Sequence, residues 1–199
     1  GSLNLNNAIV EIGQGTKTGL AQIVAEEMQM PIEKVHVKTD VNTNNAPHDW
    51  ATAASRSLMM AGRAAISACQ DVKDQLKETA ARVLRCPAED LTVANEKVYI
   101  TDEPHISLDV KDVCLGYVYE NGNAIGGQVI GRGNYIARQL SSLDPETGEG
   151  RPDLEWTMGA QAIEIELDLT DYSYEITKAA STMDVGKVIN PDLARGQVA

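Results

Sequence analysis

A helical pattern that runs from Thr52 to about Leu84 constrains the fold of this chain more than any other feature. The stretch contains no proline, and its apolar residues recur three or four positions apart, which places them on one face of a helix. Small residues dominate the first half of that face, so a second element can pack closely against it. The face consists of Ala54, Leu58, Ala61, Ala65, Ala68, Cys69, Val72, Leu76, Ala80 and Val83.

Shorter patterns precede and follow this helix. Alternating apolar residues predict strands, and glycine, asparagine and proline mark the turns between them. In chain order, the sequence predicts a helix from a turn at 13–15 to Pro31, a strand through Val35, Val37, Thr39 and Val41, a polar loop over 42–49, a hairpin over 91–100, a capped helix from Ser107 to about Tyr119, a strand with an exposed loop over 121–152, paired strands over 162–169 and 174–177, and a helix after Asn190.

This mixture predicts an α+β fold of mixed helices and short sheets, because the regular strand–helix alternation of a doubly wound sheet is missing. The 199 residues can bury the core of one domain or of two small ones. Gly1-Ser2 is typical of a cloning remnant, and the chain stops two residues after Gly196-Gln197. We therefore expect residues 1–199 to be a domain fragment that is truncated at both ends.

Composition argues against several classes of partner. The formal net charge is −12 and no basic cluster is present, so no nucleic-acid partner is expected. No run approaches the roughly 20 apolar residues of a membrane helix, and no signal peptide is recognisable, so the prediction is a cytoplasmic protein without a membrane partner.

Three cysteines and three histidines lack metal-ligand spacing, so no residue is predicted to bind a metal directly. Cys69, Cys86 and Cys114 are expected to be buried small apolar residues.

Glycines, hydroxyls and glutamines occur where an anionic polar ligand could be held. Gly13, Gln14 and Gly15 lead directly into a helix, and free N–H groups at a helix start attract phosphate. Gln14 offers both a donor and an acceptor, and the flanking glycines permit close approach of a ligand to the backbone. The alternative is an ordinary turn with Gln14 in solvent. Gly131-Arg132-Gly133 lacks the spacing and the lysine of a phosphate loop.

Hydroxyl groups gather where the long helix is expected to begin. Thr52, Ser55 and Ser57 would there combine side-chain and backbone donors around an anion. Ordinary helix capping by Thr52, with both serines facing solvent or bonding back to the helix, explains the same residues equally well. Near the end of the chain, a glycine turn at Asp184-Val185-Gly186 precedes Asn190-Pro191, which is typical of a helix start.

Taken in order and spacing, these segments resemble the molybdopterin-binding large subunit of the xanthine dehydrogenase and aldehyde oxidase family, the molybdenum hydroxylases. The resemblance covers nearly the whole chain. It is carried by Glu11-Ile12-Gly13-Gln14-Gly15 with Gln22-Ile23-Val24-Ala25-Glu26, by Thr52 to Ser57, and by Asp184-Val185-Gly186-Lys187-Val188-Ile189-Asn190-Pro191 with Gly196-Gln197-Val198-Ala199.

The resemblance implies a molybdopterin cofactor, as the mononucleotide or the cytosine dinucleotide, with molybdenum held by the pterin dithiolene. It assigns cofactor contacts to Gly13, Gln14, Gly15, Thr52, Ser55, Ser57 and Gln197. The parent enzyme would oxidise an N-heterocycle or an aldehyde with water as the oxygen source. Its partners would be the rest of the large subunit, a small-molecule substrate, and iron–sulfur and FAD domains or subunits.

In the family, a glutamate near the molybdenum acts as the base. That glutamate comes from a segment C-terminal to Gln197, and none of Glu11, Glu26 or Glu27 matches its position. No catalytic residue is therefore assigned here, and the isolated fragment is predicted to be inactive. Two other hypotheses remain open: a phosphate- or nucleotide-binding module without a redox role, and a cofactor-free scaffold domain.

Overall fold

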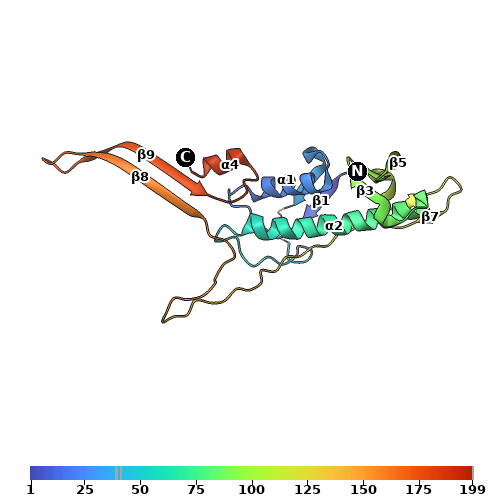
Figure 1. The fold of residues 1–199 in the computed structure, drawn as a ribbon, viewed down its shortest axis with the longest axis horizontal. Coiled ribbons are helices and arrows are strands. Elements are labelled where there is room, and N and C mark those ends of the chain that lie inside the picture. Colours follow the sequence, from blue (N-terminus) through green and yellow to red (C-terminus); the bar gives the residue numbers. More distant parts are fainter. Residues whose placement is uncertain (39, 41, 199) are drawn as a thin grey trace. The chain divides into compact units, whose positions relative to one another are not determined.

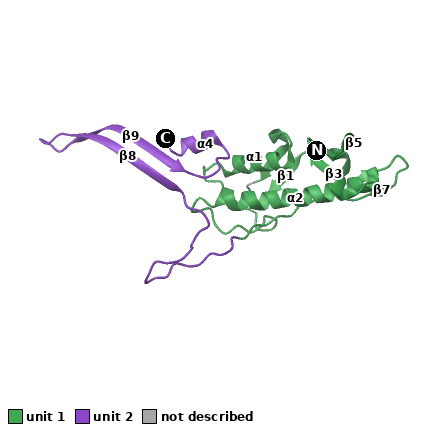
Figure 2. Cartoon of the chain, in the orientation of Figure 1, with its two compact units in different colours: residues 1–136 green, residues 137–199 purple. Residues whose placement is uncertain are grey.

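The computed structural model describes residues 1–38, 40 and 42–198. They form two compact units, residues 1–136 and residues 137–199 (Figure 2). Thr39, Val41 and Ala199, which belong to the predicted strand and to the last resembling segment, lie outside the described residues. Helices occur together with several small sheets, so the predicted α+β class is confirmed.

Two helices dominate the first unit, α1 (Thr16–Met28) and α2 (Ser57–Leu84). They lie side by side in Figure 1. A Cβ atom added to Gly19 would lie 2.8 Å from the Leu58 side chain, and one added to Gly62 would lie 2.8 Å from the Ile23 side chain. Because the contacting positions advance together along both helices, α1 and α2 run in the same direction. Both helices therefore begin at the same end of the pair.

Short sheets complete the first unit. β1 (Leu3–Asn6) pairs in parallel with β2 (Val35–Lys38), and α1 connects the two strands. β3 (Leu91–Ala94), β4 (Lys97–Ile100) and β5 (Glu103–Asp109) form an antiparallel sheet. The remaining elements are the 3-10 turns Ile32–Lys34 and Ala88–Asp90, α3 (Val110–Val113), and the pair β6 (Tyr117–Val118) and β7 (Ala124–Ile125).

One hydrophobic core joins the helices to these sheets. Leu20 and Val24 of α1 belong to the same buried cluster as Leu76 of α2, and the strands contribute apolar side chains such as Leu91 and Val98 to it. Burial of such side chains is the main favourable contribution to folding. The largest side chains with less than 2 % exposure are Leu20, Val24, Leu76, Leu91, Val98 and Val113.

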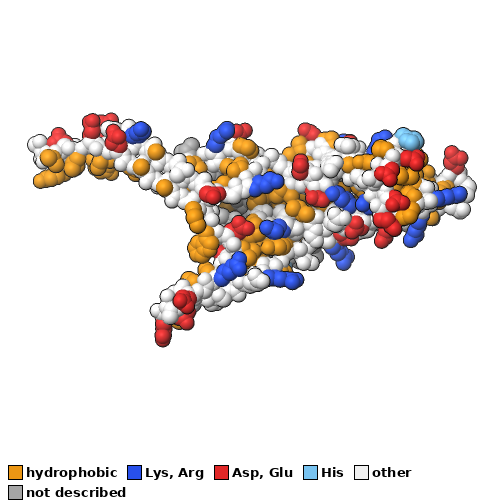
Figure 3. All heavy atoms as spheres, in the orientation of Figure 1, with side chains coloured by type: hydrophobic (Ala, Val, Ile, Leu, Met, Phe, Trp, Pro, Cys, Tyr) orange, Lys and Arg blue, Asp and Glu red, His pale blue; other side chains and the backbone are white. Residues whose placement is uncertain are grey.

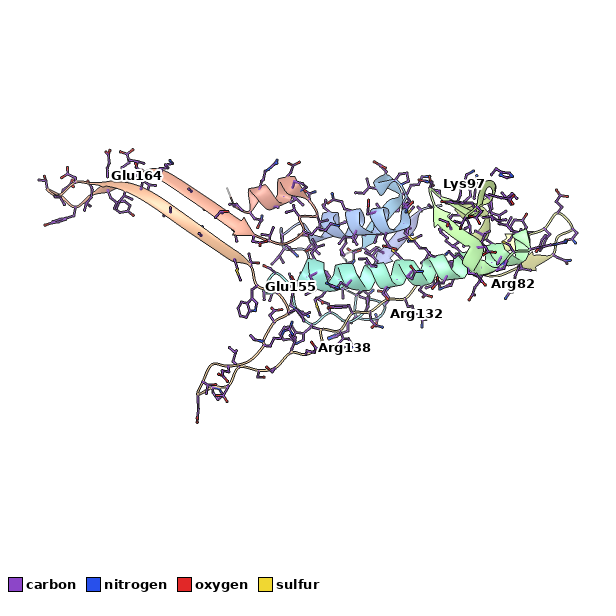
Figure 4. All side chains as sticks on the ribbon, viewed as in Figure 1. Arg82, Lys97, Arg132, Arg138, Glu155 and Glu164 are labelled. Atoms are coloured by element: carbon purple, nitrogen blue, oxygen red, sulfur yellow. The ribbon has the colours of Figure 1, made fainter. Side chains whose placement is uncertain are left out.

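An extended segment that follows β7 packs along α2. The side-chain amide of Gln75 forms two hydrogen bonds with the backbone of Ile130. Its Nε2 donates to the Ile130 carbonyl at 3.0 Å, and its Oε1 accepts from the Ile130 N–H at 3.2 Å. One turn earlier, the Asp71 carboxylate accepts the Arg132 N–H at 2.7 Å. Arg132 accordingly lies beside α2 in Figure 4. The Gly131-Arg132-Gly133 motif thus serves helix packing.

The second unit contains a long antiparallel hairpin, β8 (Met158–Leu167) and β9 (Tyr174–Asp184), and the short helix α4 (Pro191–Gly196). Ile165 faces Ile176 across the hairpin, whereas Glu164 faces Lys178 on the opposite side. Figure 3 shows hydrophobic side chains along one side of this ribbon and charged ones along the other. Glu164 is labelled on the ribbon in Figure 4. Between residues 137 and 157 the chain forms no regular element.

Three predictions about regular structure were wrong in detail. The long helix begins at Ser57 and not at Thr52, because Ala54 and Ser55 have positive φ angles of 51° and 55° that a right-handed helix cannot contain. Ser107 lies within β5, and the helix expected to reach Tyr119 ends at Val113. Cross-strand pairing with β4 outweighs the capping tendency of Ser107, which is a tertiary effect.

The thiol of Cys69 should be the least reactive of the three cysteine thiols. Its side chain is buried on α2, whereas Cys86 and Cys114 are half-buried, so the prediction of buried cysteines is confirmed in full only for Cys69. Burial, together with the charge of Glu27, raises the pKa of Cys69 to about 11. At pH 8 we expect Cys69 to be alkylated more than about tenfold slower than the other two cysteines, since the thiolate is the reactive form. Peptide mapping of a time course with iodoacetamide measures this, and equal rates would contradict it.

Within the described residues, no helix is both long and apolar enough to span a membrane. In that same part of the chain, His, Cys, Asp and Glu side chains do not gather in groups of three or more that could hold a metal ion.

Candidate functional site

Two loops carry most of the predicted contact residues, and both lie where the parallel helices begin. Residues 10–15 lead into α1, and residues 50–56 lead into α2. The Thr52 hydroxyl donates to the Val10 carbonyl at 3.3 Å, which joins the loops across 42 positions of sequence. The structure therefore brings the Gly13–Gly15 segment and the Thr52–Ser57 segment together.

The N-terminus of α1 is filled by a carboxylate of the chain itself. Oε1 of Glu11 accepts the N–H groups of Gly13 at 3.0 Å and Gly15 at 2.9 Å, and Oε2 accepts the Lys17 N–H at 3.0 Å. The Lys17 N–H, with those of Gly15, Gly13 and Thr16, holds the pKa of the Glu11 carboxyl below its usual value, although burial acts in the opposite direction. The N–H groups that we expected to attract phosphate are thus already engaged by Glu11.

Gln14 lies at the tip of the same loop, and its amide is oriented by two hydrogen bonds. Its Oε1 accepts the Ile12 N–H at 2.7 Å, and its Nε2 donates to the Val10 carbonyl at 2.9 Å. A primary amide has two N–H donors and two acceptor sites. One donor and one acceptor site of the exposed Gln14 side chain therefore remain for a ligand.

The N-terminus of α2, by contrast, has no side-chain cap, and of its two serines Ser55 is exposed whereas Ser57 is buried. Within the described residues, the backbone N–H groups of Ser57, Leu58 and Met59 have no acceptor, and neither Ser55 nor Ser57 forms a side-chain hydrogen bond. The first turn of α2 contains no acidic residue. Such unpaired N–H groups, together with the positive end of the helix dipole, favour an anion.

Arg56 adds a positive charge at this position. Its guanidinium lies 5.0 Å from the centre of the Trp50 ring, and its Nη1 donates to the Ala51 carbonyl at 3.1 Å. No carboxylate of the described residues forms an ion pair with Arg56. A cation at the positive end of a helix is electrostatically unfavourable by itself. Its charge is therefore available to an anionic ligand.

The second unit carries the remaining predicted residue. Gln197 is exposed at the C-terminal end of α4, where its N–H donates to the carbonyls of Ala194 and Arg195. The predicted helix start is confirmed, because Oδ1 of Asn190 accepts the Leu193 N–H at 2.9 Å. The expected turn is also present: Asp184 accepts the Gly186 N–H at 2.9 Å, and Gly186 has a φ of 69°.

Two shallow surface depressions lie away from these loops. One, of about 580 Å³, is lined by Gln22, Glu26, Gln29 and Asn95 among others. The second, of about 540 Å³, is lined by Ser2, Lys34, Glu96 and Lys97 among others. Neither includes a predicted contact residue, and both are open to solvent, so they carry no functional argument.

Comparison with known proteins identifies the family. A family model described as "Molybdopterin cofactor-binding domain" matches residues 1–199. The chain belongs to this family. The putative xanthine dehydrogenase molybdenum-binding subunit of Escherichia coli is 28% identical over 199 residues, which are 100% of this chain and 24% of the relative. Aldehyde oxidase 1 of Bos taurus is 27% identical over 200 residues, covering 100% of this chain and 13% of the relative.

A solved structure supports the fold. The crystal structure of a Cu,Mo-CO dehydrogenase matches with a TM-score of 0.73 at 23% identity, over 99% of this chain and 23% of that one. The resemblance to the xanthine dehydrogenase and aldehyde oxidase family is confirmed by these matches, and this molybdopterin-binding chain spans about a quarter of the length of the Escherichia coli relative.

Sequence reasoning missed Glu11 and Arg56. Glu11 is part of the resembling motif and is excluded as the catalytic base, but no capping role is predicted for it, although an acidic residue shortly before a Gly-x-Gly turn and a helix is a recognisable signal for helix capping. Arg56 lies inside the serine segment, but its stacking on Trp50 depends on a loop shape that the pattern does not specify.

Proposed function

We propose that this chain holds the molybdopterin cofactor in a molybdenum hydroxylase that oxidises an N-heterocycle or an aldehyde. One observation carries the proposal: the Val10 carbonyl accepts from both the Gln14 amide and the Thr52 hydroxyl, which joins the Gln14 loop to the segment that leads into the uncapped N-terminus of α2. Unpaired donors suit a phosphate, and an amide with one free donor and one free acceptor suits a pterin edge. The residues present therefore fit the group that the family name describes.

Each residue has a defined role in this proposal. Ser55, Ser57 and the first N–H groups of α2 hold the phosphate of the cofactor, and Arg56 adds to its attraction. Gln14, between Gly13 and Gly15, orients the pterin or an oxo group, and Thr52 fixes the Gln14 loop through the Val10 carbonyl. A cofactor contact of Gln197 is proposed on the family resemblance alone. The bound cofactor supplies the redox centre, and the oxygen of the product comes from water.

The proposal also covers the other parts of the enzyme. Iron–sulfur and FAD groups would lie on other domains or subunits, and the base would come from another segment of the large subunit. The hairpin has an exposed apolar face, on which Ile163, Ile165 and Ile176 are each more than half exposed. Such a face supports a large partner, either the rest of the large subunit or another subunit. The cofactor would be either the mononucleotide or the cytosine dinucleotide.

Cofactor analysis of the full-length parent protein tests this function. We expect molybdenum and fluorescent oxidised pterin close to one per chain, and a fall of at least about tenfold in a Gln14→Ala, Ser55→Ala double variant, since lost hydrogen bonds to a charged group weaken binding by that order. Gln70→Ala, which removes an exposed amide of the same kind from α2, is the control and should retain the cofactor.

The contrary outcomes favour different functions. A parent chain that contains neither component, although it was expressed in cofactor-competent cells, would contradict the proposal. Calorimetric binding of free nucleotides by that chain would then favour a nucleotide-binding module, and the absence of such binding would favour a scaffold domain.

A further inference from the structure

The carboxylate of Glu11 brackets Gln14. Its Oε1 accepts from Gly13 and from Gly15, the two residues on either side of Gln14, and its Oε2 accepts from Lys17 in the first turn of α1. One side chain thus fixes the loop before its tip, after its tip, and at the helix that follows. Hydrogen bonds from N–H groups to an ionised acceptor are among the stronger ones in proteins.

The loop has a shape that requires such a clamp. Gly13 and Gly15 have φ angles of 103° and 80°, which residues other than glycine rarely adopt. Glycine has the largest backbone freedom in the unfolded or open state, so two glycines around Gln14 would leave its position undefined without a restraint. Besides the contacts of Glu11, the Gln14 amide itself closes the loop through Val10 and Ile12.

Glu11 also decides which helix can receive an anion. Its carboxylate oxygens accept the N–H groups at the start of α1, whereas the N–H groups at the start of α2 have no acceptor within the described residues. A phosphate near α1 would be repelled by the carboxylate, and one at α2 would meet unpaired donors. The two helix starts are thus chemically different although they lie at one end of the pair.

We propose that Glu11 is a positioning residue for the cofactor: its carboxylate holds the Gly13–Lys17 backbone so that the Gln14 amide is presented to the pterin. The inference rests on the proposed function of this site. Glu11 does not touch the cofactor. It acts through the backbone of Gly13 and Gly15, and its Oε1 atom makes both of the bonds that bracket Gln14.

Two variants of the full-length parent protein separate this role from a simple effect of charge on α1. Glu11→Gln retains a side-chain oxygen that can accept from Gly13 and Gly15, although it loses the negative charge and the bond to Lys17. Glu11→Ala loses every bond. Glu26→Gln removes an exposed carboxylate from α1 and is the matched control. Pterin and molybdenum per chain are measured, together with hydrogen exchange of the peptide that covers residues 12–17.

The positioning role predicts an order among the variants. Glu11→Ala should retain pterin about tenfold less well than the parent and should lose exchange protection at residues 13, 15 and 17. Glu11→Gln should stay within about threefold of the parent and keep protection at 13 and 15 alone. A Glu11→Gln variant as poor as Glu11→Ala would show that charge on the helix matters, and would overturn the assignment.

The same measurements distinguish failure of the inference from failure of the proposed function. A Glu11→Ala variant that keeps its pterin, in a parent protein that contains pterin, overturns only the role of Glu11. A parent protein without pterin overturns the proposed function and the inference with it. A parent-like pterin content in Glu26→Gln shows that the effect belongs to the loop and not to acidic residues of α1 in general.

Discussion

A Ser55→Asp variant of the full-length parent protein should lose its molybdopterin while its fold stays intact. Ser55 is exposed, forms no side-chain hydrogen bond within the described residues, and has a φ of 55°, a conformation that aspartate adopts more readily than serine. The new carboxylate would lie beside the start of α2, where we place the cofactor phosphate. Repulsion between this carboxylate and the cofactor phosphate costs on the order of 3 kcal/mol, which corresponds to an affinity for the cofactor about a hundredfold lower.

Ser55→Asn is the control for this variant. Asparagine has nearly the same shape as aspartate and accepts the same backbone conformation, but it carries no charge. We expect it to retain most of the pterin, and we expect thermal unfolding of both variants to stay close to that of the parent. Pterin fluorescence and metal analysis after gel filtration measure the difference. Equal cofactor content in the two variants would place the phosphate away from α2.

Elements that follow from a repeated apolar spacing or from a cap within one turn were predictable from the sequence. The helical spacing of apolar residues predicted the end of α2 at Leu84 correctly. Alternation predicted the paired strands β8 and β9, although β8 begins earlier, at Met158, and β9 continues further, to Asp184. Asn190 before Pro191 located the start of α4, because a cap acts within one turn. Such signals depend only on residues that are close in sequence, so they can be interpreted without knowing the tertiary fold.

Features that depend on distant partners were not predictable in this way. β5 forms because β4 pairs with it, and β1 was missed because its partner β2 lies across α1. At the candidate site, the ordered motifs picked out two loops that the structure joins through Thr52 and Val10. That only the start of α1 has its N–H groups bound by a carboxylate became evident from the geometry of Glu11. A glycine-flanked turn predicts free N–H groups but does not reveal which acceptor has already taken them.

The Gly131-Arg132-Gly133 segment illustrates the same limit, because its glycines are explained by a helix that precedes them by about 60 residues. A Cβ atom at position 133 would lie 2.1 Å from the carbonyl oxygen of Ala64 and 2.3 Å from the N atom of Ala68. Both atoms belong to the backbone of α2 and cannot move aside as a flexible side chain would. Only glycine allows the segment to lie this close to the helix.

Gly133→Ala should therefore detach this segment from α2. Overpacking of this kind costs about 1 to 3 kcal/mol, so amides of residues 129–133 should exchange about 5- to 150-fold faster. Hydrogen exchange of the parent protein measures this directly, because the Ile130 and Arg132 N–H groups bond to Gln75 and Asp71. Gly127→Ala is the matched control, since a Cβ there would meet no atom within 4 Å. If both variants exchanged like the parent, close packing against α2 would not be the reason for the glycine, and the motif would again require a functional explanation.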